Sequence, residues 1–226
     1  MLTQRSQEKE LLDLGSDHYT PAEFQHCQTK LFTINRLLGF FSSTVRLLKR
    51  FPKDSSVVDV GCGGGLFLLH LSQYFPAMNF LGIDISADAI QIAQHAKKTY
   101  PDAKVLFQQT PLDQIKKNTI DILLTTLVCH HMSDEELVEF LRLAFASTQK
   151  IVIINDLHRH AIAHWFYGLI SPILFRNRLI THDGLISIRR GFIRREWTLL
   201  LEKAGIKNYE IKWCFPFRWR VILWKT

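Results

Sequence analysis

The sequence has few cysteines and no long hydrophobic run. Its four cysteines, Cys27, Cys62, Cys129 and Cys214, are far apart and form no CxxC pair. Neither a disulfide framework nor a cysteine zinc site is therefore indicated, and we expect a cytoplasmic environment. The N-terminus has no apolar signal core, and the longest apolar stretch, residues 161–175, is too short to span a bilayer. We expect a soluble chain, with peripheral contact to the inner face of a membrane as its closest approach to lipid.

Negative charge is scarce in the last third of the chain. Residues 151–226 contain 13 Lys and Arg against 5 Asp and Glu, whereas residues 1–150 contain 15 against 16. The net charge of +7 therefore comes from the last third. A basic surface of this kind can face nucleic acid, an anionic membrane or an acidic substrate, and it can also be an ordinary solvated surface.

From residue 56 onward, short apolar runs alternate with helical patterns, which indicates a parallel sheet with crossover helices. Strands are predicted at "SVVDV", "NFLGID", "KVLF", "DILLTT" and "KIVIIND", followed by two closing strands at "NYEIKWCF" and "RWRVILWK". Between them, "SADAIQIAQHAKKTY" has Ser86 as a helix N-cap, and "SDEELVEFLRLAFAST" begins with a capping box. We predict an α/β fold whose mostly parallel, seven-stranded sheet carries helices on both faces.

Two further segments depart from this alternation. Residues 1–50 are predicted to be an N-terminal helical extension, with helices over residues 5–50 apart from a break near "GSDHYTP". Residues 51–226 are then the main domain, with an insertion at about 157–192 after the fifth strand. Within that insertion "AIAHWFYGLISPILF" is predicted to be a mostly apolar helix and "THDGLISIRRGF" a polar loop.

The stretch "VVDVGCGGG", residues 57–65, places glycines directly after the first strand. Ligands of open parallel sheets bind at the carboxyl ends of the strands, and glycines let the backbone approach them closely. The dinucleotide pattern G-x-G-x-x-G fails, because its last position falls on Leu66. Asp59 would also repel a pyrophosphate, whereas it suits a ligand with an ammonium group, such as S-adenosylmethionine.

This stretch resembles the first motif of the class I S-adenosylmethionine-dependent methyltransferases, D/E-x-G-x-G-x-G, at Asp59, Gly61, Gly63 and Gly65. The resemblance implies a Rossmann-like fold and S-adenosylmethionine as the cofactor. In that family the glycine turn cradles the methionine part of the cofactor. Asp59 would then interact with the cofactor amino group, and Cys62 would fill the small position between two glycines.

Further cofactor residues follow from the ends of the other strands. Asp84 ends the second strand, where a carboxylate can accept hydrogen bonds from both ribose hydroxyls, and Ile85 would lie beside the adenine. After the third strand many relatives have an acidic residue, but this chain has Gln109 and Thr110, and Thr110 is our candidate there. The fourth motif of the family corresponds to "TTLVCHHM", with Thr126 and Leu127 beside the methionine part.

Methyl transfer from a sulfonium mainly requires alignment of the acceptor with the methyl group, and a general base only if the acceptor must lose a proton. His131 is one candidate base, although packing of the turn is an alternative role for it. His182 with Asp183 is a second candidate. Substrate contacts are assigned to Asn35, Arg36, His160 and Arg190. No metal is predicted, because His160 and His164 lack a clear third ligand.

The resemblance extends to a bacterial branch that modifies small molecules, whose extension and insertion form a lid over the substrate. Because the insertion here is apolar and aromatic, we expect a small hydrophobic acceptor of phenolic, polyketide or quinone-like type, with O-methylation slightly favoured over C-methylation. The apolar face could instead be ordinary lid packing or lie in a membrane interface. An RNA methyltransferase is the main alternative, but [DN]-P-P-[YF] and a Pro-Cys nucleophile are both missing, which argues against nucleic acid. A non-catalytic cofactor-binding protein is the third interpretation, and the oligomeric state is left open.

Overall fold

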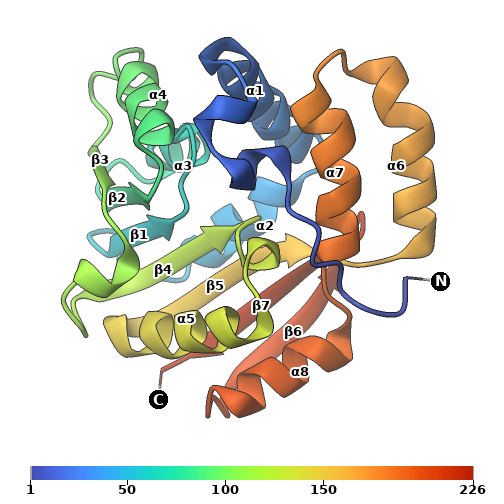
Figure 1. The fold of residues 1–226 in the computed structure, drawn as a ribbon. Coiled ribbons are helices and arrows are strands. Elements are labelled where there is room, and N and C mark those ends of the chain that lie inside the picture. The colour runs from blue at the N-terminus through green and yellow to red at the C-terminus, as the bar shows by residue number, and fades with distance from the viewer. Residues whose placement is uncertain (1, 226) are drawn as a thin grey trace.

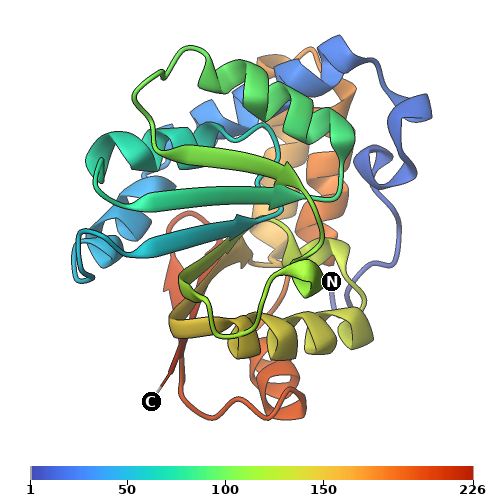
Figure 2. The same ribbon diagram turned by 90° about the vertical axis from the view of Figure 1, so that its left-hand side faces the viewer.

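A computed structural model describes residues 2–225, which form a twisted sheet with helices on both faces (Figures 1 and 2). The strands are β1 (Ser56–Val60), β2 (Asn79–Asp84), β3 (Val105–Gln109), β4 (Ile120–Thr126), β5 (Thr148–Leu157), β6 (Tyr209–Cys214) and β7 (Arg218–Trp224). Their order is β3-β2-β1-β4-β5-β7-β6; β1 to β5 are mutually parallel, and β7 is antiparallel to both of its neighbours. The predicted seven-stranded, mostly parallel sheet is confirmed.

The helices divide between the two faces and the top of the sheet. They are α1 (Pro21–Leu37), α2 (Phe40–Leu48), α3 (Leu66–Tyr74), α4 (Ala87–Lys97), α5 (Asp134–Ser147), α6 (Ala161–Leu174), α7 (Arg178–Arg190) and α8 (Arg194–Lys203). Buried side chains of α2, α3 and α4 form one core with the sheet, and those of α5 and α8 form the other. Because α2 belongs to the first of these cores, part of the N-terminal extension packs directly on the sheet.

The central strands are apolar because helices cover both of their faces. Ile122, Leu123 and Leu124 of β4 are consecutive and fully buried, and they alternate between the two cores. A buried parallel strand is expected to show such an unbroken apolar run. Burying each of these side chains stabilises the fold by roughly 1.5–3 kcal/mol. The carboxyl ends of β1 and β4, where the strand order reverses, are thereby held rigidly.

Helices α1, α6 and α7 lie above the carboxyl ends of the strands (Figure 1). They meet in a small cluster of their own, with Cys27, Leu179 and Ile180 buried at its centre. The chain before α1 is different from the prediction: residues 5–10 are not helical, and only two short 3-10 turns follow, η1 (Leu11–Leu14) and η2 (Ser16–His18). This segment is held by side chains of α7, which the local sequence does not reveal.

The prediction of a polar loop at "THDGLISIRRGF" is wrong, because most of this stretch lies in α7. Asn177 starts the helix, since its side chain accepts a hydrogen bond from the Leu179 N–H. Gly184 sits inside the helix because a Cβ there would lie 2.3 Å from the hydroxyl of Tyr167 on α6. The glycine that favours a loop in the sequence therefore serves close helix packing. Within the described residues, no helix is both long and apolar enough to cross a membrane.

Candidate functional site

The glycine turn after β1 is fixed to the end of β2 by backbone hydrogen bonds. The N–H groups of Gly61 and Cys62 both donate to the Ile83 carbonyl, at 2.8 and 3.1 Å. Gly61, Gly63 and Gly65 have φ of 72°, 52° and 71°, a region that side chains disfavour. The turn leads straight into α3, so the unpaired N–H groups of that helix face the same space.

Asp84 connects the turn to the end of β2. Its two carboxylate oxygens accept hydrogen bonds from the backbone N–H groups of Gly63 and Ser86, each at 2.9 Å. Capping of α4 is done separately by Ser86, whose hydroxyl accepts from Ala89. Each oxygen of Asp84 keeps a second lone pair, so the carboxylate can still accept ribose hydroxyls. The structure thus gives Asp84 a role in shaping the turn that the sequence did not reveal.

Asp59 is buried beneath the turn, with 3% of its surface exposed. Its Oδ1 has no hydrogen-bond partner among the described residues. Burial, together with the nearby charge of Asp84, raises the pKa of Asp59 to about 8. A buried carboxyl group without a partner is costly, and a cationic ligand group would compensate it. The site therefore fits the ammonium group of S-adenosylmethionine.

An exposed apolar side chain, that of Ile85, follows the end of β2 beside the turn. Ile85 is 76% exposed directly after β2, and the side-chain amide of Gln109 donates to the Ile85 carbonyl at 3.2 Å. Thr110, the sequence candidate, is buried, and its hydroxyl lies 2.9 Å from the Gln114 amide oxygen. Gln109 is exposed beside Ile85, so it is better situated than Thr110 to meet an adenine there.

The end of β4 closes the other side of the turn. Leu127 has a left-handed backbone, with φ of 59°, and its N–H donates to the Asn155 carbonyl at 2.8 Å. This bend follows Thr126 directly and turns the chain toward the glycine loop. A Cβ at Gly61 would lie 2.5 Å from Val128. Val128 therefore borders the turn, and the placement of Thr126 and Leu127 beside the methionine part of a cofactor stays a prediction.

Two residues that the sequence reasoning missed reach the site from the N-terminal extension. The amide oxygen of Gln28, on α1, accepts a hydrogen bond from the Gly64 N–H at 3.2 Å. Tyr19 lies near enough for the charges of Asp88 and Asp84 to add to burial in raising the pKa of its phenol. The helical period of α1 indicates which residues face the core, but it does not tell which core they face.

His131 and its neighbour His130 follow β4 in the short turn η4 (Cys129–His131). The Nδ1 of His131 lies 2.6 Å from Asp13, and the Nδ1 of His130 lies 2.7 Å from the buried Asp156. Burial favours neutral groups here, but the pairing outweighs it: the pKa of His131 is raised, and that of Asp13 is lowered to about 2. His131 is thus held beside the N-terminal segment, which contains Asp13.

The other candidate catalytic residues hold the N-terminal segment in place. Asp183 is buried and accepts the backbone N–H groups of Leu11 and Leu12 at 3.0 and 3.2 Å. His182 pairs with Asp183 at 2.9 Å, but its side chain is 52% exposed. The pair therefore belongs to α7 and lies against η1, and it is not part of a loop.

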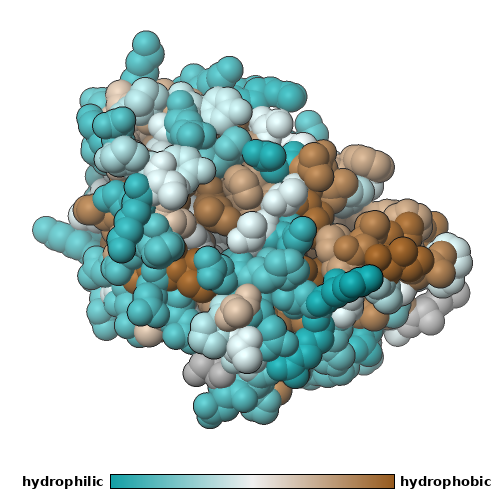
Figure 3. All heavy atoms as spheres, turned by 90° about the horizontal axis from the view of Figure 1, so that it is seen from above, coloured by the Kyte–Doolittle hydropathy of each residue, from teal (hydrophilic) through white to brown (hydrophobic). Residues whose placement is uncertain are grey.

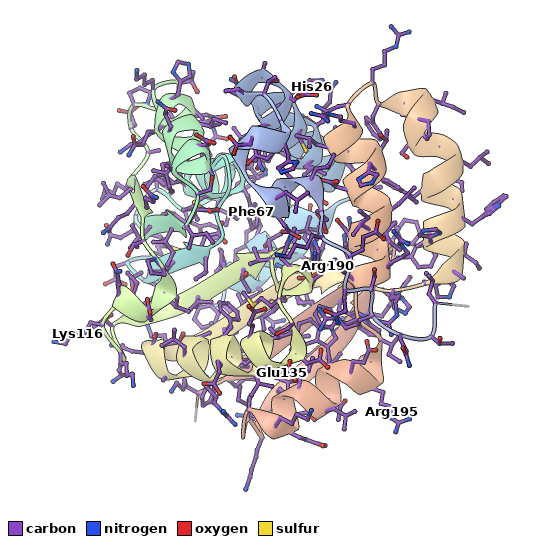
Figure 4. All side chains as sticks on the ribbon, viewed as in Figure 1. His26, Phe67, Lys116, Glu135, Arg190 and Arg195 are labelled. Atoms are coloured by element: carbon purple, nitrogen blue, oxygen red, sulfur yellow. The ribbon has the colours of Figure 1, made fainter. Side chains whose placement is uncertain are left out.

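Arg190, labelled in Figure 4, uses its guanidinium to join α7 to the N-terminal segment and to η4. It donates to the carbonyls of His130, His131 and Glu8 and to the carboxylate of Asp13. All three guanidinium nitrogens of Arg190 therefore donate to groups of the protein itself. Its contacts connect α7 and the N-terminal segment with η4.

The remaining substrate candidates make separate contacts. Asn35 is buried in α1, and its side-chain oxygen lacks a partner among residues 2–225. Arg36 is exposed and lies over the ring of Phe32. His160 caps α6 by accepting from the Ile162 N–H. Of these, Asn35 alone points inward with an unused polar atom.

Comparison with known proteins agrees with this geometry. A family described as "Methyltransferase domain" matches residues 57–150, which include the glycine turn, Asp84 and the end of β4. An uncharacterized protein of Rickettsia prowazekii is 34% identical over 88 residues, which make up 38% of this chain and 31% of that protein. A carboxy-S-adenosyl-L-methionine synthase of Campylobacter jejuni is 22% identical over 198 residues, or 80% of this chain and 84% of the synthase. The first of these relatives is thus matched over about a third of its own length.

Solved structures share the whole architecture. A methyltransferase from Aquifex aeolicus, described as dependent on S-adenosylmethionine, superposes with a TM-score of 0.64 at 19% identity, covering 91% of this chain and 98% of the other. Human N-acetylserotonin methyltransferase, solved in complex with S-adenosylmethionine, superposes with a TM-score of 0.67 at 15% identity. The match covers 91% of this chain and 56% of the other. Residues 57–150 match a methyltransferase-domain family, and the chain shares the α/β fold of these solved methyltransferases.

Proposed function

We propose that this protein is a methyltransferase that uses S-adenosylmethionine. The observation that carries the proposal is the buried, unpartnered carboxyl group of Asp59 beneath the glycine turn, with Asp84 at the adjoining strand end. When bound, the cofactor supplies an electrophilic methyl group. Asp59 would hold its ammonium group, Asp84 would accept hydrogen bonds from its ribose hydroxyls, and Ile85 with Gln109 would border its adenine.

The acceptor is a small hydrophobic molecule, in our proposal an aromatic one methylated on oxygen. The lid supports this: α1, α6 and α7 meet through apolar side chains above the strand ends. No exposed base is needed for an acidic phenol, since the reaction depends mainly on alignment and exclusion of water. Of the candidate catalytic residues His131, His182 and Asp183, His131 is the one closest in sequence to the end of β4.

The proposal is tested by incubating the protein with methyl-labelled S-adenosylmethionine and either a lipid extract or total RNA. We expect label in a low-molecular-weight lipophilic product. Label in RNA would overturn the acceptor class and favour the RNA methyltransferase. An altered cofactor without a methylated product, detected by mass spectrometry, would instead indicate a reaction like that of the carboxy-S-adenosyl-L-methionine synthase. Cofactor binding without any product would indicate a non-catalytic protein.

We also propose that α6 docks on an anionic membrane surface. Its outer face carries large exposed apolar side chains, namely Ile162, Trp165, Phe166, Leu169, Ile173 and Leu174. Figure 3 shows hydrophobic surface on the side where α6 lies. Exposed Trp213 and Phe215 of the β6–β7 hairpin continue this face, because the Trp213 indole donates to His158, close to the N-terminal end of α6.

Charge complementarity favours lipid as the occupant of this apolar face. Helix α6 contains no Asp, Glu, Lys or Arg, whereas exposed Arg176 follows it and exposed Lys212 precedes Trp213. Aromatic and aliphatic side chains bordered by cations are typical of helices that lie in a bilayer interface. A lipophilic acceptor dissolved in the bilayer would then be close to the lid.

Vesicle sedimentation tests whether the exposed face of α6 binds membranes. Anionic phosphatidylglycerol vesicles should retain the protein more strongly than neutral phosphatidylcholine vesicles, and added salt should weaken the difference. Trp165→Ser should weaken binding roughly 10-fold, because burying a large apolar side chain is worth about 1.5–3 kcal/mol. Leu106→Ser, at an exposed leucine of β3, is the matched control. The proposal that α6 binds membranes would be refuted if all variants bound the vesicles equally. It would also be refuted if the protein bound RNA and not the vesicles.

A further inference from the structure

We propose that Glu10, His130 and His131 form a binding site for a divalent transition-metal ion. Their ligand atoms all lie within 4.8 Å of one another. The Nε2 atoms of His130 and His131 lie 3.6 and 3.8 Å from the two oxygens of Glu10. Two ligands at a tetrahedral angle around zinc, with bonds of about 2.0–2.1 Å, lie about 3.3–3.4 Å apart. Shifts of a few tenths of an ångström would bring either histidine to that distance from the carboxylate.

The outer partners of the histidines are those of a metal site. Each Nδ1 is hydrogen-bonded to a carboxylate: His130 to Asp156 at 2.7 Å and His131 to Asp13 at 2.6 Å. Metal-binding histidines commonly give their second ring nitrogen to a carboxylate, which fixes the ring and makes the free nitrogen more basic. Both Nε2 atoms thus converge on Glu10, at separations too long for a hydrogen bond.

The charges around the cluster also favour a cation. Three carboxylates, Glu10, Asp13 and Asp156, surround the two rings, and the guanidinium of Arg190 pairs with Asp13. With neutral imidazoles, two negative charges remain within this set; the guanidinium of Arg218, whose charge interacts with Asp156, offsets one of them, and the remaining negative charge favours a cation. Glu10 is 2% exposed, and its carboxylate accepts a hydrogen bond from Ser187. Protonated histidines are the competing way to balance the charge.

The site would fasten the lid to the sheet. Glu10 belongs to the N-terminal segment, whereas both histidines follow β4, so a bound ion would join segments that are about 120 residues apart in the chain. Two histidines and one carboxylate are a common three-ligand set that leaves a coordination position open. Access is from the side of His131, whose side chain is 28% exposed. This inference does not depend on the proposed methyl transfer.

The test is equilibrium dialysis of the full chain, without an affinity tag, against zinc, followed by elemental analysis. We expect one ion per chain, and cobalt in its place should give visible absorption bands. Glu10→Gln and His131→Asn should each weaken binding at least ~10-fold, since even outer-shell changes cost about 10–100-fold. His182→Asn is the matched control, because His182 also pairs with a carboxylate but lies outside the cluster.

The proposal is overturned if the purified chain binds no stoichiometric zinc, or if His131→Asn binds it as the unchanged protein does. Equal loss in His182→Asn would also overturn it, since binding would then depend on the general fold. Should Glu10→Gln fail to fold, thermal melting decides the question. Zinc must raise the melting temperature of the unchanged protein above the value measured with a chelator. For His131→Asn, the melting temperatures with zinc and with chelator must be the same.

Discussion

The Gly64 N–H donates a hydrogen bond of 3.2 Å to the side-chain oxygen of Gln28, so helix α1 reaches into the glycine turn. A Cβ at the neighbouring Gly63 would lie 2.6 Å from the same oxygen. Gln28 therefore occupies one backbone donor of the turn, the Gly64 N–H just before α3. A cofactor that used the Gly64 N–H would have to displace Gln28 from it, so we expect the position of α1 to be coupled to cofactor binding.

Replacing Gln28 should strengthen cofactor binding. Gln28→Ala removes one hydrogen bond that must break before a ligand uses the Gly64 N–H, and such a bond contributes about 0.5–1.5 kcal/mol. We expect the affinity for S-adenosylhomocysteine, measured by calorimetry, to rise by about 2- to 10-fold. Gln25→Ala, at an exposed position of the same helix, should have no effect. A fall in affinity would show instead that Gln28 holds the cofactor directly.

Removing the Asp84 carboxylate should weaken cofactor binding. Asp84→Ala frees the Gly63 and Ser86 N–H groups that shape the turn and removes the acceptor for the ribose. Hydrogen bonds to charged groups are worth about 1.5–3 kcal/mol, so the affinity should fall by at least ~10-fold. Asp102→Ala, at an exposed site outside the turn, is the control. Unchanged affinity in Asp84→Ala would show that the ribose lies elsewhere.

Cofactor binding should release a proton near pH 7. The pKa of Asp59 is about 8 because the group is buried and lies near Asp84, so it is mostly protonated in the free protein at that pH. An ammonium group beside it favours the ionised form. Affinity should therefore rise with pH between about 6 and 8, and calorimetry in buffers of different ionisation enthalpy should detect the proton. Identical enthalpies in all buffers would contradict the role of Asp59.

The same carboxyl group should make the free protein less stable as the pH rises. Its folded pKa of about 8 exceeds the ordinary value of 3.8, so between these values the folded state holds a proton that the unfolded chain has lost. The free energy of unfolding contributed by this group therefore falls from pH 4 to pH 8. Urea unfolding of Asp59→Asn should show a smaller fall than the unchanged protein. Parallel pH profiles would contradict the raised pKa.

The sheet and the cofactor turn could be predicted because local patterns determine them. Apolar runs mark β1 to β5, and the glycines with Asp59 and Asp84 specify a turn at strand ends. The contacts of the N-terminal segment were out of reach, because Leu11 meets Asp183 across 172 residues of the chain. The polar side chains of "THDGLISIRRGF" serve such contacts, since Asp183 and Arg190 form hydrogen bonds with the backbone of other segments. Asn177 was the overlooked signal for the start of this helix.

The N-terminal segment should open when Asp183 loses its charge. Its two oxygens accept from Leu11 and Leu12, and Asp183→Asn replaces one of them with an NH₂ group that opposes an N–H donor. The loss of a hydrogen bond to a charged group costs about 1.5–3 kcal/mol, so amide exchange of residues 8–14 should accelerate at least ~10-fold. Asp113→Asn, at an exposed position, should leave it unchanged. If residues 8–14 stay protected in Asp183→Asn, the other contacts of the segment, among them those of Arg190 to Glu8 and Asp13, suffice to hold it.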